Sequence, residues 1–322
     1  MKKLNILAND GLAGSARKAL EKTGHKVYTA KVEQENLADF INEHNIHVLI
    51  VRSATKVRKE LLDKAQPLKM IIRAGVGLDN IDTDYAKQKG VTVHNTPSAS
   101  SHSVAELVFA HLLSGVRFLH ESNREMPLTG DTEFKQLKKK YSKGRELQGK
   151  TLGIIGFGRI GREVAKIAVG LGMKPLAYDP YIEEAIIHLQ FFDGQSLDFS
   201  IKTVSKEEVL KNADFLTLHV PAQAEPVIGE KEIDMMKDGA GIVNAARGGV
   251  IDEAAAVKAL ENGKLSFLAL DVFADEPQPP IQLLMHPLVS LSPHIGASTV
   301  EAQERIGEEI VKKIEEFAQA VD

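Results

Sequence analysis

The sequence predicts an α/β protein with two doubly wound parallel sheets. Short aliphatic and β-branched runs alternate with longer segments of helical periodicity along all 322 residues, which is typical of consecutive βαβ units. The runs form two series, and those of the second series are almost free of polar residues, as expected for strands covered on both faces. A chain of this length also fits two domains.

The first series predicts a small sheet near the N-terminus. Its strands are expected at 5–8, 47–51, 70–73 and 91–94, with helices at 14–23 and 57–64 between them. The second series predicts a larger sheet, with strands at 151–155, 175–178, 215–219, 241–245 and 267–270. A further apolar strand is expected at 288–291.

Two helical segments define the expected domain boundaries. Residues 100–124 carry apolar side chains at helical spacing and would connect the sheets. Ser298 and Glu301 form a capping-box pattern before an amphipathic segment that runs to the C-terminus. No strand follows this last helix, so we expect it to pack on the first domain. The first expected domain comprises residues 1–99 and 291–322, and the second comprises residues 100–290.

Composition excludes several functional classes. The chain has no cysteine, which rules out disulfides, a thiolate nucleophile, a thiolate zinc site and a cysteine-bound iron–sulfur cluster. Forty basic and 44 acidic residues give a net charge of −4, so we expect neither a nucleic-acid nor a membrane partner. The basic stretch 135–145 is interpreted as a solvated linker face, and no histidine spacing suggests a metal site. Because no signal or membrane segment is visible, the expected location is the cytoplasm.

A glycine-rich loop predicts a dinucleotide site. Gly156-Phe157-Gly158-Arg159-Ile160-Gly161 follows an apolar strand and opens a helical pattern. The first glycine would permit a tight turn, the second would let the backbone approach a pyrophosphate, and the third would let helix and strand pack closely. The helix N-terminus would then face the phosphates.

An acidic residue in register with this loop indicates NAD as the cofactor. Asp179 ends the next strand, 21 residues after Gly158, where a carboxylate binds a ribose diol and repels the 2′-phosphate of NADP. Asp179 could instead cap the loop before Pro180. The agreement of strand, turn, helix and acid favours the dinucleotide hypothesis.

Arg247, Glu276 and His294 are the candidate catalytic residues, because they follow later strands at the edge where open α/β sheets bind ligands. Arg247 could hold a substrate carboxylate and polarise a carbonyl. His294 could exchange a proton with the reacting oxygen, and Glu276 could orient its imidazole. Each residue alone would more often be structural, and their coincidence with a nucleotide fold favours catalysis.

Two arginines in the first series suggest an anionic substrate. Arg52 and Arg73 each end a strand, and Arg73 precedes Ala74 and Gly75, whose backbone is accessible. Two guanidinium groups there would suit a doubly charged acid, although surface ion pairs are the alternative. His219 follows a strand and is expected to line the cofactor site, whereas His47, His94 and His111 are interpreted as packed or partly exposed structural residues.

Together these motifs resemble the D-2-hydroxyacid dehydrogenase family. The resemblance rests on segments 51–57, 73–75, 79–82, 95–97, 156–161, 244–249, 269–273 and 293–299, together with Gly77, and spans nearly the whole chain. It implies a flavodoxin-like substrate domain into which a Rossmann NAD-binding domain is inserted, and dimerisation through the latter.

The resemblance also assigns site residues. Arg247, Glu276 and His294 would be catalytic, and Arg52, Ser53, Arg73, Ala74, Gly75, Arg247 and His294 would bind substrate. Beyond the glycine loop and Asp179, the cofactor would contact His219, Val220, Pro221, Ala245, Arg247, Asp271, His294 and Gly296. Asp271 would lie near the nicotinamide amide.

Within the family the chain is most similar to the branch that oxidises 3-phospho-D-glycerate to 3-phosphohydroxypyruvate for serine biosynthesis. Many members of that branch carry a regulatory domain, which we do not expect here because the sequence ends at Asp322. The alternatives are a glyoxylate/hydroxypyruvate reductase or D-lactate dehydrogenase of the same family and, more remotely, an NAD-sensing co-repressor-like binding protein.

Overall fold

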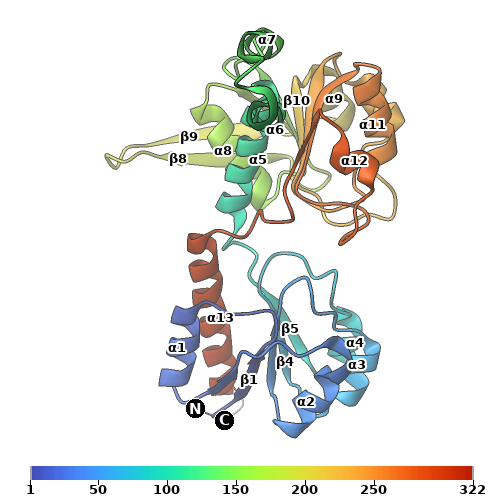
Figure 1. The fold of residues 1–322 in the computed structure, drawn as a ribbon. Helices are drawn as coiled ribbons and strands as arrows, with labels where there is room; N and C mark the ends of the chain where they lie inside the picture. The colour runs from blue at the N-terminus through green and yellow to red at the C-terminus, as the bar shows by residue number, and fades with distance from the viewer. Residues whose placement is uncertain (1, 321–322) are drawn as a thin grey trace. The chain divides into compact units, whose positions relative to one another are not determined.

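The computed structural model describes residues 2–320 and divides the chain into two compact units. Unit 1 consists of Met1–Ser101 and Ala297–Asp322, and unit 2 consists of His102–Gly296. Each unit is built on a parallel sheet with helices on both faces, which confirms the predicted fold class (Figure 1).

Unit 1 contains a five-stranded parallel sheet in the order β2-β1-β3-β4-β5. Its strands are β1 (Asn5–Ala8), β2 (Lys26–Tyr28), β3 (Val48–Val51), β4 (Met70–Arg73) and β5 (Thr92–Asn95). Its helices are α1 (Gly14–Lys22), α2 (Leu37–Glu43), α3 (Lys59–Lys64), α4 (Thr83–Gln88) and α13 (Val300–Ala320), with a short 3₁₀ turn at Gln34–Asn36. The strand order is that of flavodoxin-like sheets and reverses between β1 and β3.

Helices α1 and α13 cover one face of this sheet, and α2, α3 and α4 cover the other (Figure 1). The apolar stripe of α13, which includes Ile306, Ile310 and Ile314, is buried against β1, β3 and β4. A Cβ at Gly307 would lie 2.8 Å from the Cβ of Ala16, so α13 and α1 are in close contact at this point. The cap of α13 lies one residue later than the sequence pattern suggests, because the Thr299 hydroxyl accepts the Ala302 N–H at 3.2 Å.

Unit 2 contains a six-stranded parallel sheet in the order β13-β12-β11-β10-β6-β7. Its strands are β6 (Thr151–Ile155), β7 (Lys174–Tyr178), β10 (Phe215–Leu218), β11 (Ala240–Asn244), β12 (Leu265–Leu270) and β13 (Val289–Leu291). The order reverses between β6 and β10, and a ligand of an open α/β sheet binds at such a switch point.

Two apolar clusters cover the faces of this sheet. One face packs against α5 (Ser101–Val116) and α8 (Arg159–Gly170). The other packs against α9 (Lys206–Asn212), α10 (Glu230–Met235), α11 (Glu253–Glu261) and α12 (Ile281–Met285). Because both faces are covered, the strands of the second series contain few polar residues.

The structure differs from the sequence prediction in three segments of unit 2. The single helix predicted at 100–124 is broken at Phe118, whose φ of 56° is left-handed, so that α6 (Leu119–Thr129) begins as a separate helix. Part of the basic linker forms α7 (Phe134–Lys140). Residues 181–202, which have weak periodicity, form an antiparallel hairpin of β8 (Glu184–Gln190) and β9 (Ser196–Lys202).

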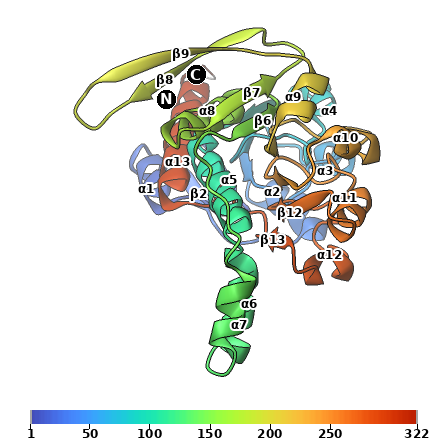
Figure 2. The same cartoon turned by 90° about the horizontal axis from the view of Figure 1, so that it is seen from above.

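The hairpin and the α6–α7 pair leave the body of unit 2 in different directions (Figure 2). The hairpin is amphipathic. In the middle of β8, Ile187 is buried against the cluster around α8, whereas Leu197 and Phe199 on the same face are exposed. Among the helices of residues 2–320, none has both the length and the apolar character needed to cross a bilayer.

Candidate active site

The glycine loop lies at the switch point of unit 2, directly after β6. Gly156 has a φ of +96°, and a Cβ there would lie 2.4 Å from the carbonyl oxygen of His219, so only glycine fits without moving the backbone. A Cβ at Gly161 would lie 2.2 Å from the Gly156 carbonyl oxygen, which shows how closely α8 packs on the turn.

Gly158, by contrast, borders open space. A Cβ at this position would meet no atom within 4 Å. Gly158 is the residue before α8, so the free N–H groups of that helix start beside this space. A tight first glycine, an open second glycine and a packed third glycine are the arrangement that a pyrophosphate needs.

Asp179 is coupled directly to the loop. One oxygen of its carboxylate accepts the Phe157 N–H at 2.8 Å, and the other accepts the N–H groups of Tyr181 and Ile182 at 2.9 and 3.2 Å. The carboxylate therefore braces the loop and caps the turn after β7. These hydrogen bonds fix the half-buried carboxylate at the end of β7, where the adenosine ribose is expected.

His219 follows β10 and packs beside the same loop. Its Nε2 lies 3.1 Å from the hydroxyl of Thr217, and its Nδ1 is shielded from solvent. Burial lowers the pKa of His219 from its ordinary value of 6.5 to about 3, so the ring is neutral at physiological pH. Because its ring nitrogens point inward, His219 can contact a dinucleotide only through its backbone atoms or the edge of its ring.

Arg247 is positioned by a braced turn after β11. The buried Asn244 side chain donates to the Arg247 carbonyl at 2.8 Å and accepts the Ala246 N–H at 3.0 Å. A Cβ at Gly248 would lie 1.8 Å from the carbonyl oxygen of Phe273, so the turn packs tightly on the segment that leads to Glu276. The backbone beneath the guanidinium is thus held on both sides.

Glu276 and His294, 18 residues apart in sequence, form a pair. His294 Nδ1 lies 2.9 Å from a Glu276 oxygen, and the other Glu276 oxygen accepts the Phe273 N–H at 3.0 Å. The side chains are 36% and 38% exposed, so a small molecule can reach the imidazole. With Nδ1 engaged by a carboxylate, Nε2 is the atom that can exchange a proton.

Asp271 anchors the segment that carries His294. It is buried at the end of β12, and its carboxylate accepts the N–H groups of Ile295 and Gly296, each at 2.8 Å. Its carbonyl accepts the His294 N–H, also at 2.8 Å. These bonds hold His294 in a left-handed conformation with a φ of 55°.

In unit 1, Arg52 follows β3 beside the switch point of that sheet. Its Nη2 donates to the side chain of Gln303 on α13, and Gln303 in turn donates to the Ala297 carbonyl at 2.8 Å. Arg52 Nε is buried and has no hydrogen-bond partner within the part of the chain that the structure describes. A buried guanidinium N–H of this kind is suited to an anionic ligand.

Asp10, which the sequence reasoning missed, fixes the loop that carries Arg52 and Ser53. Its carboxylate accepts the Arg52 N–H at 2.7 Å, the Thr55 N–H at 3.1 Å and the Lys31 ammonium at 2.6 Å. Burial alone would raise the pKa of Asp10, but these hydrogen bonds outweigh it and lower the pKa below its ordinary value. Its position two residues after β1 is a sequence signal that could have identified it.

Asn80, also missed, closes the same loop. Its amide donates to the carbonyls of Arg52 and Thr55, each at 2.7 Å. Arg73 follows the adjacent strand β4, and its guanidinium lies over Gly75, where a Cβ would come within 1.5 Å of Nη1. The segment 73–75 is therefore shaped around the arginine itself.

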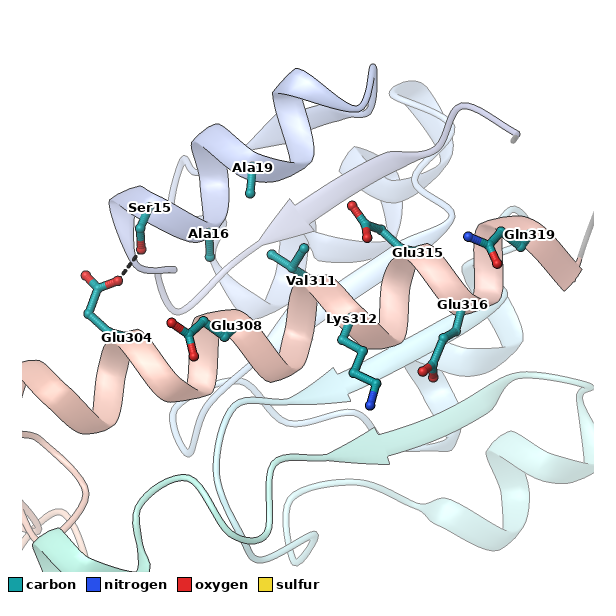
Figure 3. A pocket seen from close by; sticks show the side chains of 10 residues that line it. All are labelled: Ser15, Ala16, Ala19, Glu304, Glu308, Val311, Lys312, Glu315, Glu316 and Gln319. Carbon is teal, nitrogen blue, oxygen red and sulfur yellow. Dashed lines mark hydrogen bonds between the residues drawn. The ribbon is translucent and has the colours of Figure 1, made fainter. Parts of the chain in front are cut away.

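A groove of about 440 Å³ lies between α1 and α13 of unit 1, away from all these residues (Figure 3). Four glutamates line it together with Lys312, and Ser15 hydrogen-bonds to Glu304 across it. None of the candidate site residues contributes to its wall. Within the described residues, no three histidine, aspartate or glutamate side chains gather as metal ligands.

Comparisons with known proteins agree with this geometry. Residues 109–296 match the model of the D-isomer specific 2-hydroxyacid dehydrogenase, NAD binding domain family. The chain belongs to this family. It is accordingly an NAD-dependent dehydrogenase of the 2-hydroxy acid class, and the predicted cofactor is confirmed.

Three relatives illustrate its place in the family. The chain is 42% identical to a hydroxypyruvate reductase of Thermotoga maritima over 322 residues, covering 98% of both proteins. It is also 42% identical to a D-3-phosphoglycerate dehydrogenase of Methanocaldococcus jannaschii over 313 residues, which cover 97% of this chain but 57% of that longer protein. An NAD⁺-bound 3-phosphoglycerate dehydrogenase of Entamoeba histolytica has a similar structure, with a TM-score of 0.76 and 29% identity over 97% of this chain and 94% of that one.

Proposed function

We propose that this dehydrogenase oxidises 3-phospho-D-glycerate to 3-phosphohydroxypyruvate, and that it therefore acts as a phosphoglycerate dehydrogenase in serine biosynthesis. The observation that carries the proposal is Arg52, whose enclosed Nε has no partner among the described residues and whose loop is fixed by Asp10 and Asn80. A pre-oriented guanidinium binds phosphate or carboxylate oxygens in charge-assisted hydrogen bonds, and because this proposal assigns the substrate carboxylate to Arg247, Arg52 is left for the phosphate. From the family resemblance we further infer a homodimer formed through unit 2.

The residues of unit 2 account for the chemistry in this proposal. NAD, held by the glycine loop and Asp179 of unit 2, would supply the hydride acceptor for C2 of the hydroxy acid, and NADH would supply the hydride for the keto acid. Neutral His294 takes the hydroxyl proton at Nε2 during oxidation and returns it to the carbonyl oxygen during reduction. Glu276, 2.9 Å from Nδ1, stabilises the imidazolium that forms. Such a positioned acid–base group typically contributes about 10² to 10⁴ in rate.

Arg247 has two roles in the proposed mechanism. Its guanidinium binds the substrate carboxylate, and it stabilises the negative charge that develops on the reacting oxygen. The brace from Asn244 keeps the backbone of Arg247 in place while the long side chain reaches the substrate. Because both roles depend on one group, loss of Arg247 raises KM and lowers kcat together.

A second candidate function is supported by a specific observation. The hydroxypyruvate reductase of Thermotoga maritima matches this chain over 98% of each protein. A hydroxypyruvate reductase would use the same Arg247, Glu276 and His294 but would not need an arginine for a phosphate. The two functions therefore differ in whether Arg52 and Arg73 bind a substrate phosphate.

The proposal is tested by NADH oxidation with 3-phosphohydroxypyruvate, hydroxypyruvate and pyruvate measured side by side. A phosphoglycerate dehydrogenase gives the highest kcat/KM with the phosphorylated acid. Equal or higher kcat/KM with hydroxypyruvate would transfer the protein to the second function. NADH binding without turnover of any keto acid would contradict both enzymatic functions and favour an NAD-sensing binding protein.

A further inference from the structure

A buried chain of hydrogen bonds leads from helix α5 to the segment that carries His294. It begins at His111, which is 6% exposed. His111 Nδ1 lies 2.9 Å from the hydroxyl of Ser290, and Nε2 lies 2.8 Å from the hydroxyl of Ser292. The Ser292 hydroxyl donates to Asp271 at 2.6 Å. Asp271 in turn accepts the N–H groups that follow His294.

The direction of this chain follows from counting protons. An ionised carboxylate only accepts, so the single proton of the Ser292 hydroxyl points to Asp271. Ser292 must then accept from His111, which places a proton on Nε2. The lone pair of a neutral ring is left at Nδ1, where it accepts the Ser290 hydroxyl. Every polar atom of the buried chain is satisfied by one tautomer of one neutral histidine.

The electrostatic environment of His111 supports the neutral form. Burial lowers its pKa below the ordinary value, and the neighbouring His120 of α6 acts in the same direction. The charge of Asp271, directly after β12, acts against both but does not reverse the result. A protonated ring would donate at both nitrogens and would force the Ser290 hydroxyl to turn away.

We propose that His111 is a positioning residue that sets the geometry of His294 through Ser292 and Asp271. The inference rests on the acid–base role proposed for His294, but not on which 2-hydroxy acid is the substrate. His294 has a left-handed backbone, which is unfavourable for a residue with a side chain and must be imposed by its surroundings. Asp271 imposes it, and the His111–Ser292 bond fixes the direction of the hydroxyl that holds Asp271.

Substitutions at position 111 distinguish positioning from packing. A glutamine amide reaches about as far as Nε2 and can donate to Ser292, whereas an asparagine amide reaches only about as far as Nδ1. We expect His111→Gln to retain most of the wild-type kcat. In His111→Asn and His111→Leu, kcat should fall about tenfold, because the hydrogen bond to Ser292 is lost. The dissociation constant of NADH should stay within about twofold in all three variants. Ser290→Ala, which leaves the bond to Ser292 intact, is the matched control and should keep the wild-type kcat.

Two outcomes would overturn the proposal. One is a kcat that follows side-chain volume, with His111→Leu above His111→Gln. The other is a loss in all variants that parallels their loss of Tm, since this would indicate a structural role alone.

A measurement on the wild type keeps the inference independent of variant folding. In ¹⁵N-histidine NMR spectra, His111 should show the neutral tautomer protonated at Nε2 between pH 6 and pH 8.5, with and without NADH. A charged ring or a proton on Nδ1 would contradict the proposed chain. If the wild type turns over no keto acid, the proposed function fails, while the tautomer of His111 still tests the hydrogen-bond chain by itself.

Discussion

The neutral His219 beside the glycine loop makes the stability of this protein depend on pH in a predictable way. The folded-state pKa of His219 is about 3, below the ordinary value of 6.5 that the unfolded chain has. The unfolded chain therefore binds more protons between these two values. As a result, the contribution of His219 to stability is present above pH 6.5, falls as the pH falls through 6.5, and levels off below about pH 3.

The size of this effect can be worked out for an accessible pH range. The pKa of His219 is 6.5 in the unfolded chain and about 3 in the folded protein. Lowering the pH from 8 to 5 should therefore reduce the free energy of unfolding by about 2 kcal/mol. His219 as a residue is only half-buried although its Nδ1 is enclosed. Water at the ring edge reduces the penalty, so we expect a loss of about 1 to 2 kcal/mol.

Urea unfolding of wild type and His219→Gln at pH 5, 6, 7 and 8 isolates this contribution. Glutamine can accept from Thr217 but does not titrate, and all other titrations cancel when the two proteins are compared. The free energy of unfolding of the wild type relative to the variant should fall by about 1 to 2 kcal/mol from pH 8 to pH 5. Parallel curves for wild type and His219→Gln would refute the reasoning and would mean that the ring is solvated.

Three further predictions concern the site itself. Gly156→Ala should weaken NADH binding about tenfold or more in a fluorescence titration, because its Cβ would lie 2.4 Å from a carbonyl oxygen. The control Gly170→Ala, whose Cβ has no atom within 4 Å, should bind NADH normally, and equal affinities of the two variants would contradict the prediction. Glu276→Gln should lower kcat for keto-acid reduction about tenfold while NADH affinity is retained, since a charge-assisted hydrogen bond becomes a neutral one; an unchanged kcat would remove Glu276 from the mechanism. Asp10→Asn should raise KM for the phosphorylated acid several-fold and leave KM for pyruvate nearly unchanged, because it loosens the loop of Arg52; equal changes for both acids would argue against that role.

The parts of the fold that depend on local sequence could be predicted. The glycine loop, the strands of unit 2 and the final helix are encoded by short motifs and by continuous apolar runs. Strand β2 was missed because it is three residues long. The break at Phe118 was missed because the apolar spacing continues across it. The β8–β9 hairpin was missed because β8 interrupts the alternation of apolar and polar residues with the adjacent Ile186 and Ile187, although β9 alternates regularly.

The contacts around the candidate site residues depended on tertiary structure. The partnership of Glu276 and His294 was expected from strand ends, which meet at one edge of a parallel sheet. The roles of Asp10 and His111 were not, because their partners are about 40 and 180 residues away and no motif links them. His111 in particular was interpreted as a packed residue, since a single histidine among apolar neighbours on a helix carries no local signal of a hydrogen-bond chain.

The most direct test of the central claim is the phosphate preference of the enzyme and its dependence on Arg52. The quantity to measure is the ratio of kcat/KM for 3-phosphohydroxypyruvate to that for hydroxypyruvate, with NADH, in wild type, Arg52→Gln and Arg58→Gln. Arg58 is a suitable control because it is engaged with Asp82 at 2.8 Å. We predict a ratio of at least about tenfold in wild type and in Arg58→Gln, and a ratio near one in Arg52→Gln. A wild-type ratio near or below one, or a high ratio that survives the loss of Arg52, would contradict the account.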